Sequence, residues 1–177
     1  RSDGNCSNNY TLTRYWNATD DCNNTASCVQ VITVQDTQAP VFDQDCPADL
    51  TVECNAVPLP AVLNATDNCD LNITVEFNEV RSDGNCSNNY TLTRYWNATD
   101  DCNNTARCVQ VITVQDTQPP VFDQDCPADL TAECDAVPLP AVLNATDNCD
   151  QNITVEFNEV RSDGNCSNNY TLTRYWN

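Results

Sequence analysis

The sequence has no histidine, only 3 glycines and few basic residues. Its 177 residues include 26 acidic but only 7 basic ones, which gives a formal net charge of −19. A chain this acidic repels nucleic acid and anionic lipid surfaces, so we expect neither as a partner. No apolar run approaches the roughly 18 residues that mark a transmembrane helix, so this segment is not expected to insert into a membrane.

Cysteine, in contrast, is abundant, with 13 in the chain. In small units, this density indicates either a metal site or disulfides. Since there is no histidine and no Cys-x-x-Cys pair, a zinc site has little support. We therefore predict disulfides, which places the protein outside the cytoplasm, in the extracellular space or on a cell surface.

The chain is built from one repeated sequence of 80 residues. Residues 1–80 and 81–160 differ at five positions, and residues 161–177 repeat residues 1–17 without a change. The differing pairs are Ser27/Arg107, Ala39/Pro119, Val52/Ala132, Asn55/Asp135 and Leu71/Gln151. Tandem units this similar usually build length rather than one active site, and we expect a window cut from a longer array.

A proline-containing linker, residues 36–40 and again 116–120, is the best boundary between units, because proline restricts the chain after an apolar strand. Residues 37–116 are then one complete unit. Residues 1–36 are the C-terminal half of a preceding unit, and residues 117–177 are the N-terminal part of the next.

Within the complete unit the apolar residues alternate with period two, which is typical of strands. Short strands are predicted at residues 41–42, 50–54, 62–67, 72–80, 90–99 and 109–115, with a turn at residues 81–84. In the strand at 90–99, Tyr90, Leu92, Trp96 and Ala98 should face inward. The predicted fold class is all-β, with tandem immunoglobulin-like antiparallel β-sandwiches of about 80 residues linked head to tail.

Several motifs resemble the HYR (hyalin repeat) family, and more narrowly the cysteine-rich HYR-like repeats of large extracellular and bacterial surface proteins. They are Ala-Thr-Asp-Asn-Cys at residues 65–69, the run from residue 90 to 105, Cys108, Ile-Thr-Val at 112–114, Pro-Pro-Val at 119–121 and Cys-Pro-Ala-Asp at 126–129. The resemblance implies an immunoglobulin-like fold, an extracellular location and a role in adhesion or matrix. The sequence departs from the family pattern at Asn103, where the family commonly has glycine.

Neither the resemblance nor the residues indicate an enzyme. The family brings no catalytic residues. The sequence has no histidine, no metal cluster and no nucleophile beside a plausible base. We expect no catalysis and no cofactor other than covalent N-glycans, with calcium as a candidate.

The strongest functional signal is an excess of the N-glycosylation triplet Asn-x-Ser/Thr. One unit has six, where about one or two are expected by chance. The predicted acceptors are Asn5, Asn9, Asn17, Asn23, Asn64, Asn72, Asn85, Asn89, Asn97, Asn103, Asn144, Asn152, Asn165 and Asn169. Several fall on the side of their strand opposite the apolar residues, as a glycan requires. Alternatively, Asn and Thr simply form the solvated face of the sandwich.

An immunoglobulin-like order of strands suggests which cysteines meet. The predicted pairs are Cys46–Cys108, Cys69–Cys102 and Cys54–Cys86, with Cys134–Cys166 repeating the last of these. The remaining cysteines, Cys6, Cys22, Cys28, Cys126 and Cys149, are expected to pair beyond the ends of the chain. Six cysteines allow 15 connectivities, so the spacing alone does not select one.

Five aspartates are expected to gather near one end of the unit: Asp36, Asp67, Asp70, Asp100 and Asp101. Carboxylates that converge on a junction between domains are candidate calcium ligands. The favoured alternative is that these aspartates cap turns by accepting bonds from nearby amides.

These observations favour a structural repeat of an extracellular, heavily N-glycosylated filament, stalk or surface adhesin. Its expected partners are neighbouring copies of the same repeat. The alternative is a calcium-dependent or carbohydrate-binding adhesion module in an array of surface domains, whose weak sites would act together.

Overall fold

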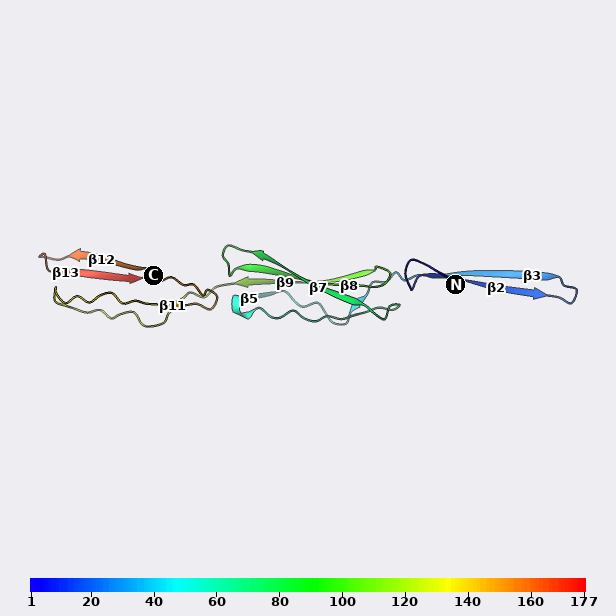
Figure 1. Ribbon diagram of the computed structural model, residues 1–177, viewed down its shortest axis with the longest axis horizontal. Helices are drawn as coiled ribbons and strands as arrows, with labels where there is room; N and C mark the ends of the chain where they lie inside the picture. Colours follow the sequence, from blue (N-terminus) through cyan, green and yellow to red (C-terminus); the bar gives the residue numbers. More distant parts are fainter.

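The computed structural model describes residues 1–177 as three β-rich bodies in a row (Figure 1). The first body contains β1 (Ser2–Asp3), β2 (Tyr10–Thr19) and β3 (Thr25–Val34). The middle body contains β4 (Val41–Phe42), β5 (Leu50–Glu53), the 3₁₀ turn η1 (Cys54–Ala56), β6 (Ala65–Thr66), β7 (Thr74–Asp83), β8 (Tyr90–Thr99) and β9 (Thr105–Gln115). The third contains β10 (Val121–Phe122), β11 (Ala145–Thr146), β12 (Phe157–Asp163) and β13 (Tyr170–Trp176).

The middle body is a two-layer β-sandwich. Its main sheet has the order β5-β9-β8-β7, with β7, β8 and β9 antiparallel and β5 parallel to β9. The second layer is the β4–β6 pair with the coil around it. The predicted all-β class is therefore confirmed.

The core lies between these layers and is small. Trp96, which is 1% exposed, packs with Leu63 and Cys108 in one cluster. A second cluster contains Leu92, Ile112 and Val114. Residues alternate along β8 between buried and half-buried positions, so the period-two pattern predicted the inward face correctly for Leu92, Trp96 and Ala98.

The predicted turn at residues 81–84 begins too early. Residues 81–83 belong to β7 and pair with the start of β8, so the chain reverses only after Gly84. A Cβ atom at Gly84 would lie 2.5 Å from the carbonyl oxygen of Asn89. This close approach, closed by the bond from Gly84 N–H to that oxygen at 2.8 Å, explains the only glycine of the unit.

One buried cation is held inside the sandwich. Arg94 is 3% exposed, and its Nε donates to Glu79 Oε2 at 2.6 Å. Its Nη2 donates to the carbonyl oxygen of Pro58 at 2.8 Å. A charge this deeply buried is tolerated because it is paired and hydrogen-bonded.

The tryptophan at one position of the repeat has different surroundings in the middle body and in the first body. Trp96 is covered by the second layer and by Phe77, whose ring centroid lies 5.3 Å away. Trp16, one repeat earlier, is 51% exposed, because the first body has only the sheet β1-β2-β3.

This pair provides an internal control for the energetics of the core. The Trp96→Ala substitution should lower the free energy of unfolding by about 3–5 kcal/mol, since it opens a cavity in a packed site. Trp16→Ala should cost less than about 1 kcal/mol. Guanidinium unfolding followed by circular dichroism, with disulfides intact, measures both. Equal losses would contradict the burial described here.

Candidate functional site: the junctions between units

Two of the three disulfides join different bodies. Cys6, in the loop between β1 and β2, is bonded to Cys102, in the turn between β8 and β9, with their Cα atoms 5.1 Å apart. Cys54, in η1, is bonded to Cys149 of the third body, with a Cα–Cα distance of 5.7 Å. Each junction along the row is therefore crossed by a covalent bond.

The third disulfide, Cys46–Cys108, lies inside the middle body, as predicted. The other predicted pairs are wrong. The partner of Cys102 is Cys6 instead of Cys69, and the partner of Cys54 is Cys149 instead of Cys86. The predicted partners Cys69, Cys86, Cys134 and Cys166 are unpaired. The prediction assumed that cysteines pair within a unit, whereas Cys6 and Cys149, which were expected to pair beyond the ends of the chain, bond to the middle unit.

Shifting the observed disulfides by the 80-residue repeat explains why each unpaired cysteine lacks a partner within the chain. The seven are Cys22, Cys28, Cys69, Cys86, Cys126, Cys134 and Cys166. Cys86 stands at the position of Cys6, so an equivalent partner would lie 96 residues further on, beyond residue 177. Cys69 stands at the position of Cys149, so its partner would lie 95 residues earlier, before residue 1. The same shift moves the partners of the other five outside residues 1–177.

The turn that carries Cys102 is shaped by local hydrogen bonds. Asp100 Oδ1 accepts the backbone N–H groups of Cys102 at 2.9 Å and Asn104 at 2.8 Å. Asn103 has a φ of 65°, a left-handed conformation that asparagine tolerates better than most residues. This explains why asparagine can replace the usual glycine there, and how the turn presents Cys102 at the end of the middle body.

All five candidate calcium ligands lie at the first junction, but in different roles. Asp70 and Asp100 are buried, and both oxygens of each accept protein donors. They cap turns, as the favoured alternative proposed. Asp101 is exposed and accepts a bond from Ser7 Oγ of the first body at 3.1 Å.

Asp67 is also a cap, since its Oδ1 accepts the N–H groups of Cys69 and Asp70, but Asp36 behaves differently. Asp36 is 4% exposed and its Oδ2 accepts no hydrogen bond. Burial raises the pKa of the Asp36 carboxyl above its ordinary value, and the charges of Asp67, Asp100 and Asp70 raise it further. The N–H of Cys69 donates to Asp67 and holds the pKa of that carboxyl below its ordinary value.

The pKa of the Cys69 thiol is also raised. Its causes are local desolvation and then the charges of Asp36, Asp67 and Asp100. A thiol in this state is a poor nucleophile and a poor zinc ligand, because both roles need the thiolate.

Most glycan acceptors lie on the surface. Asn64, Asn72, Asn85 and Asn103 of the middle body are exposed, and Asn97 is half-buried on the outward side of β8. The acceptors Asn5, Asn17, Asn23, Asn144, Asn152, Asn165 and Asn169 of the flanking bodies are exposed as well, while Asn9 is half-buried. The amides of the exposed acceptors are sterically open to modification.

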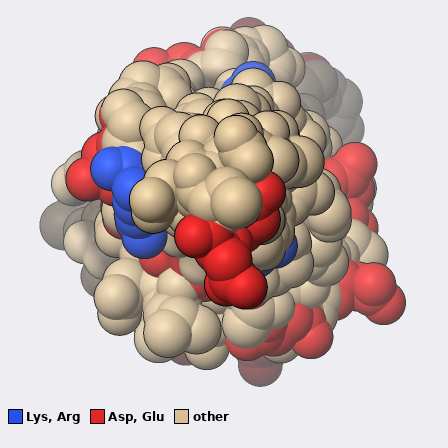
Figure 2. All heavy atoms as spheres, turned by 90° about the vertical axis from the view of Figure 1, so that its right-hand side faces the viewer, with Lys and Arg blue, Asp and Glu red and all other residues tan.

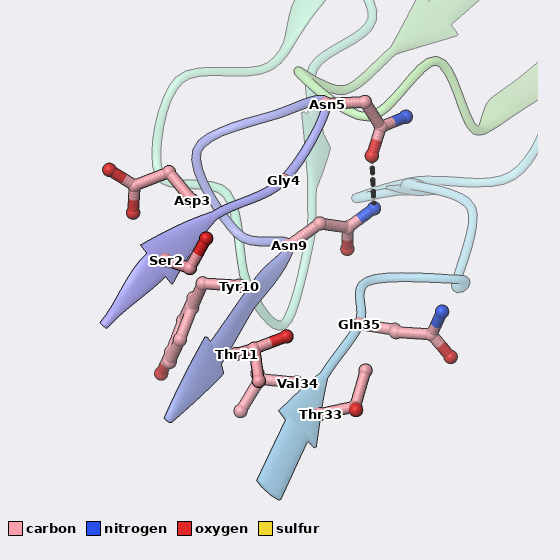
Figure 3. Close-up of a pocket in the computed structure, with 10 residues that line it drawn as sticks. All are labelled: Ser2, Asp3, Gly4, Asn5, Asn9, Tyr10, Thr11, Thr33, Val34 and Gln35. Atoms are coloured by element: carbon pink, nitrogen blue, oxygen red, sulfur yellow. Dashed lines mark hydrogen bonds between the residues drawn. The ribbon is translucent and has the colours of Figure 1, made fainter. Parts of the chain in front are cut away.

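Asn89 and its counterpart Asn9 have a second role. Asn89 Oδ1 accepts the N–H of Asp116 at 2.7 Å, and Asn89 Nδ2 donates to Asn85 Oδ1 at 3.1 Å. Figure 3 shows the same Asn9–Asn5 contact beside a shallow pocket in the first body. These side chains hold the linker against the start of β8 or β2, which is a structural task that the triplet count alone did not reveal.

That pocket does not resemble a small-molecule site. Its volume is about 200 Å³, and only two of its ten lining residues are hydrophobic. Ligand sites are usually larger and mostly apolar.

The end of the molecule formed by the first body is rich in Asp and Glu, with few Arg groups (Figure 2). This is the surface expected from the net charge of −19. No helix in the structure is both long and apolar enough to cross a membrane.

Residues 42–114 match the model of a family described as an HYR-like domain with 4 cysteines. The middle body is therefore an HYR-like domain, as the motifs indicated. The family and the three disulfides are consistent with an extracellular domain. No curated protein matches the chain.

The bond Cys6–Cys102 between the first two bodies can be tested by cleavage at one introduced lysine, because the chain itself contains none. Gln38→Lys places a single lysine in the exposed linker between the first two bodies. After cleavage by a lysine-specific protease, the two fragments should remain together on a denaturing gel and separate only when reductant is added, because Cys6–Cys102 joins them.

The control is the same substitution combined with Cys6→Ser and Cys102→Ser, whose fragments should separate without reductant. Separation of the Gln38→Lys fragments without reductant would contradict the cross-unit bond and favour pairing within the unit.

Proposed function

We propose that this protein is a structural segment of an extracellular array, in which successive HYR-like units are joined by disulfides and carry N-glycans on their outer faces. The observation that carries this proposal is the pair of disulfides between bodies, Cys6–Cys102 and Cys54–Cys149. They hold each unit to its neighbours independently of the backbone linker.

The unpaired cysteines support the extension of this pattern. On this proposal, Cys28 and Cys126 form the internal bonds of their own units, and the other five bond to neighbouring copies of the repeat. A unit then has one internal disulfide and four cysteines bonded to its two neighbours. Such an array resists pulling and partial unfolding, because the load at every junction is carried by disulfides as well as by the backbone linker.

The many Asn-x-Ser/Thr triplets favour a coat of N-glycans over a single binding site. They are spread over strands and loops of all three bodies instead of gathering in one place. Attached glycans would hydrate the array and shield its exposed backbone from proteases. The proposed role requires no catalysis.

Glycopeptide mass spectrometry of the native material tests the coat. We expect high occupancy at the exposed positions Asn64, Asn72 and Asn103, and lower occupancy at Asn89, because its amide is held by Asn85 and Asp116. Unmodified asparagine at all of these positions would refute the glycan coat while leaving the disulfide array intact.

A non-reducing peptide map of the native material tests the array. Despite the 15 connectivities available to six cysteines, only three kinds of linked peptide should appear, equivalent to Cys46–Cys108, Cys6–Cys102 and Cys54–Cys149. Alkylation before reduction should label almost no thiols. Persistent free thiols at positions such as Cys69 and Cys86 would contradict pairing with further repeats.

A further inference from the structure

All buried side-chain oxygens that lack a hydrogen-bond partner lie at the two junctions. They are Asp36 Oδ2 at the first junction, and Asp116 Oδ1, Asp147 Oδ2 and Asn148 Oδ1 at the second. Buried polar atoms are normally satisfied, and an unpaired buried carboxylate is costly. Asp36 and Asp116 occupy the same repeat position, so the feature recurs with the 80-residue period.

Other carboxylates converge on this linker aspartate from both sides. At the first junction, ligand atoms of Asp36, Asp67 and Cys69 lie within 4.8 Å of one another. At the second junction, ligand atoms of Glu53, Asp116 and Cys149 do so. The two junctions thus show complementary parts of one arrangement. The linker aspartate meets a glutamate of the preceding unit and an aspartate of the following unit.

The protein supplies no positive charge to balance these groups. Its five ion pairs involve Arg1, Arg81, Arg94, Arg161 and Arg174, and none includes a junction carboxylate. The nearby carboxylates of Asp70 and Asp100 add further negative charge at the first junction. A buried carboxylate such as Asp36, beside half-buried carboxylates of the same sign, requires a counter-ion or neutralisation.

We propose that each junction binds one Ca²⁺ ion, held by the linker aspartate together with an aspartate of the following unit and, at the second junction, a glutamate of the preceding unit. The ligands assigned are Asp36 and Asp67 at the first junction, and Glu53, Asp116 and Asp147 at the second.

Calcium fits this donor set better than other metal ions. The ligands are carboxylate oxygens, which calcium prefers, and the remaining positions of its shell can be filled by water. Zinc would need thiolate or imidazole, but Cys149 is in a disulfide and the chain has no histidine. Asp70 and Asp100 are not assigned as ligands, because the amides that occupy all their oxygens hold two turns in shape. Glu53 differs, since its oxygens accept bonds only from Thr117, an exposed residue of the linker.

The site is distinct from the glycan coat and has a different consequence. The disulfides lie in loops and turns and limit the separation of two units, but they do not bind the linker itself. A cation bridging carboxylates of both units and the linker would fix the angle between the units. Calcium would therefore stiffen the row of units.

Isothermal titration of the metal-free 177-residue chain with CaCl₂ tests the proposal. We expect about two sites per chain, with a Kd of about 0.1–1 mM, the range of extracellular calcium modules. Asp36→Asn or Asp116→Asn should each abolish one site. Asp101→Asn is the matched control, because it removes one exposed carboxylate from the same junction and should leave both sites intact.

Thermal unfolding separates loss of the site from loss of the fold. In EDTA, Asp36→Asn should melt at the same temperature as the parent chain or higher, because it removes a buried, repelled carboxylate. In about 5 mM CaCl₂ the parent chain should gain stability and the variant should gain less. Absence of saturable binding, or equal calcium binding by the parent chain and Asp36→Asn, would overturn the proposal. So would a loss of binding in Asp101→Asn alone.

Discussion

The disulfide bonds between units are the constraint on which the rest of this structure depends. The core of the complete middle unit consists of two clusters of three buried residues, which is too small to make a unit strongly stable by itself. The bonds Cys6–Cys102 and Cys54–Cys149 close loops of 96 and 95 residues, and each contributes about 4–5 kcal/mol in the chain-entropy model. A unit of this array is therefore stabilised by its neighbours through covalent bonds, whereas most tandem repeats use packing alone.

This constraint divides the surface of a unit into two regions. The ends carry cysteines, the linker aspartates and the acceptors in neighbouring loops, such as Asn85 and Asn103, whereas Asn97 on β8 lies on a side. Asn89 is an acceptor by sequence but holds the linker in the fold. At Asn89 the structural role opposes glycosylation, because an amide that fixes the linker has little freedom to carry a glycan.

The few differences between repeats leave the groups that bond at the junctions unchanged. None of the five varying positions is a cysteine or a junction carboxylate, although Ala39/Pro119 lies in the linker. Their clearest structural effect is local: Arg107 lies over the ring of Tyr95 at 4.4 Å, an interaction that Ser27 cannot make with Tyr15 in the first body. Equivalent junctions between equivalent units give a regular row, which suits a structural segment.

The sequence by itself predicted the all-β class, the approximate positions of most strands, the inward face of β8 and the internal bond Cys46–Cys108. These follow from local alternation and from the strand order of one unit. Only the tertiary structure decided that Cys102 bonds to Cys6 instead of Cys69, because identical copies offer each cysteine equivalent partners inside and outside its unit. It also decided which aspartates cap turns and which, like Asp36, are buried without a partner. Composition cannot separate these roles, since they depend on how one unit docks against the next.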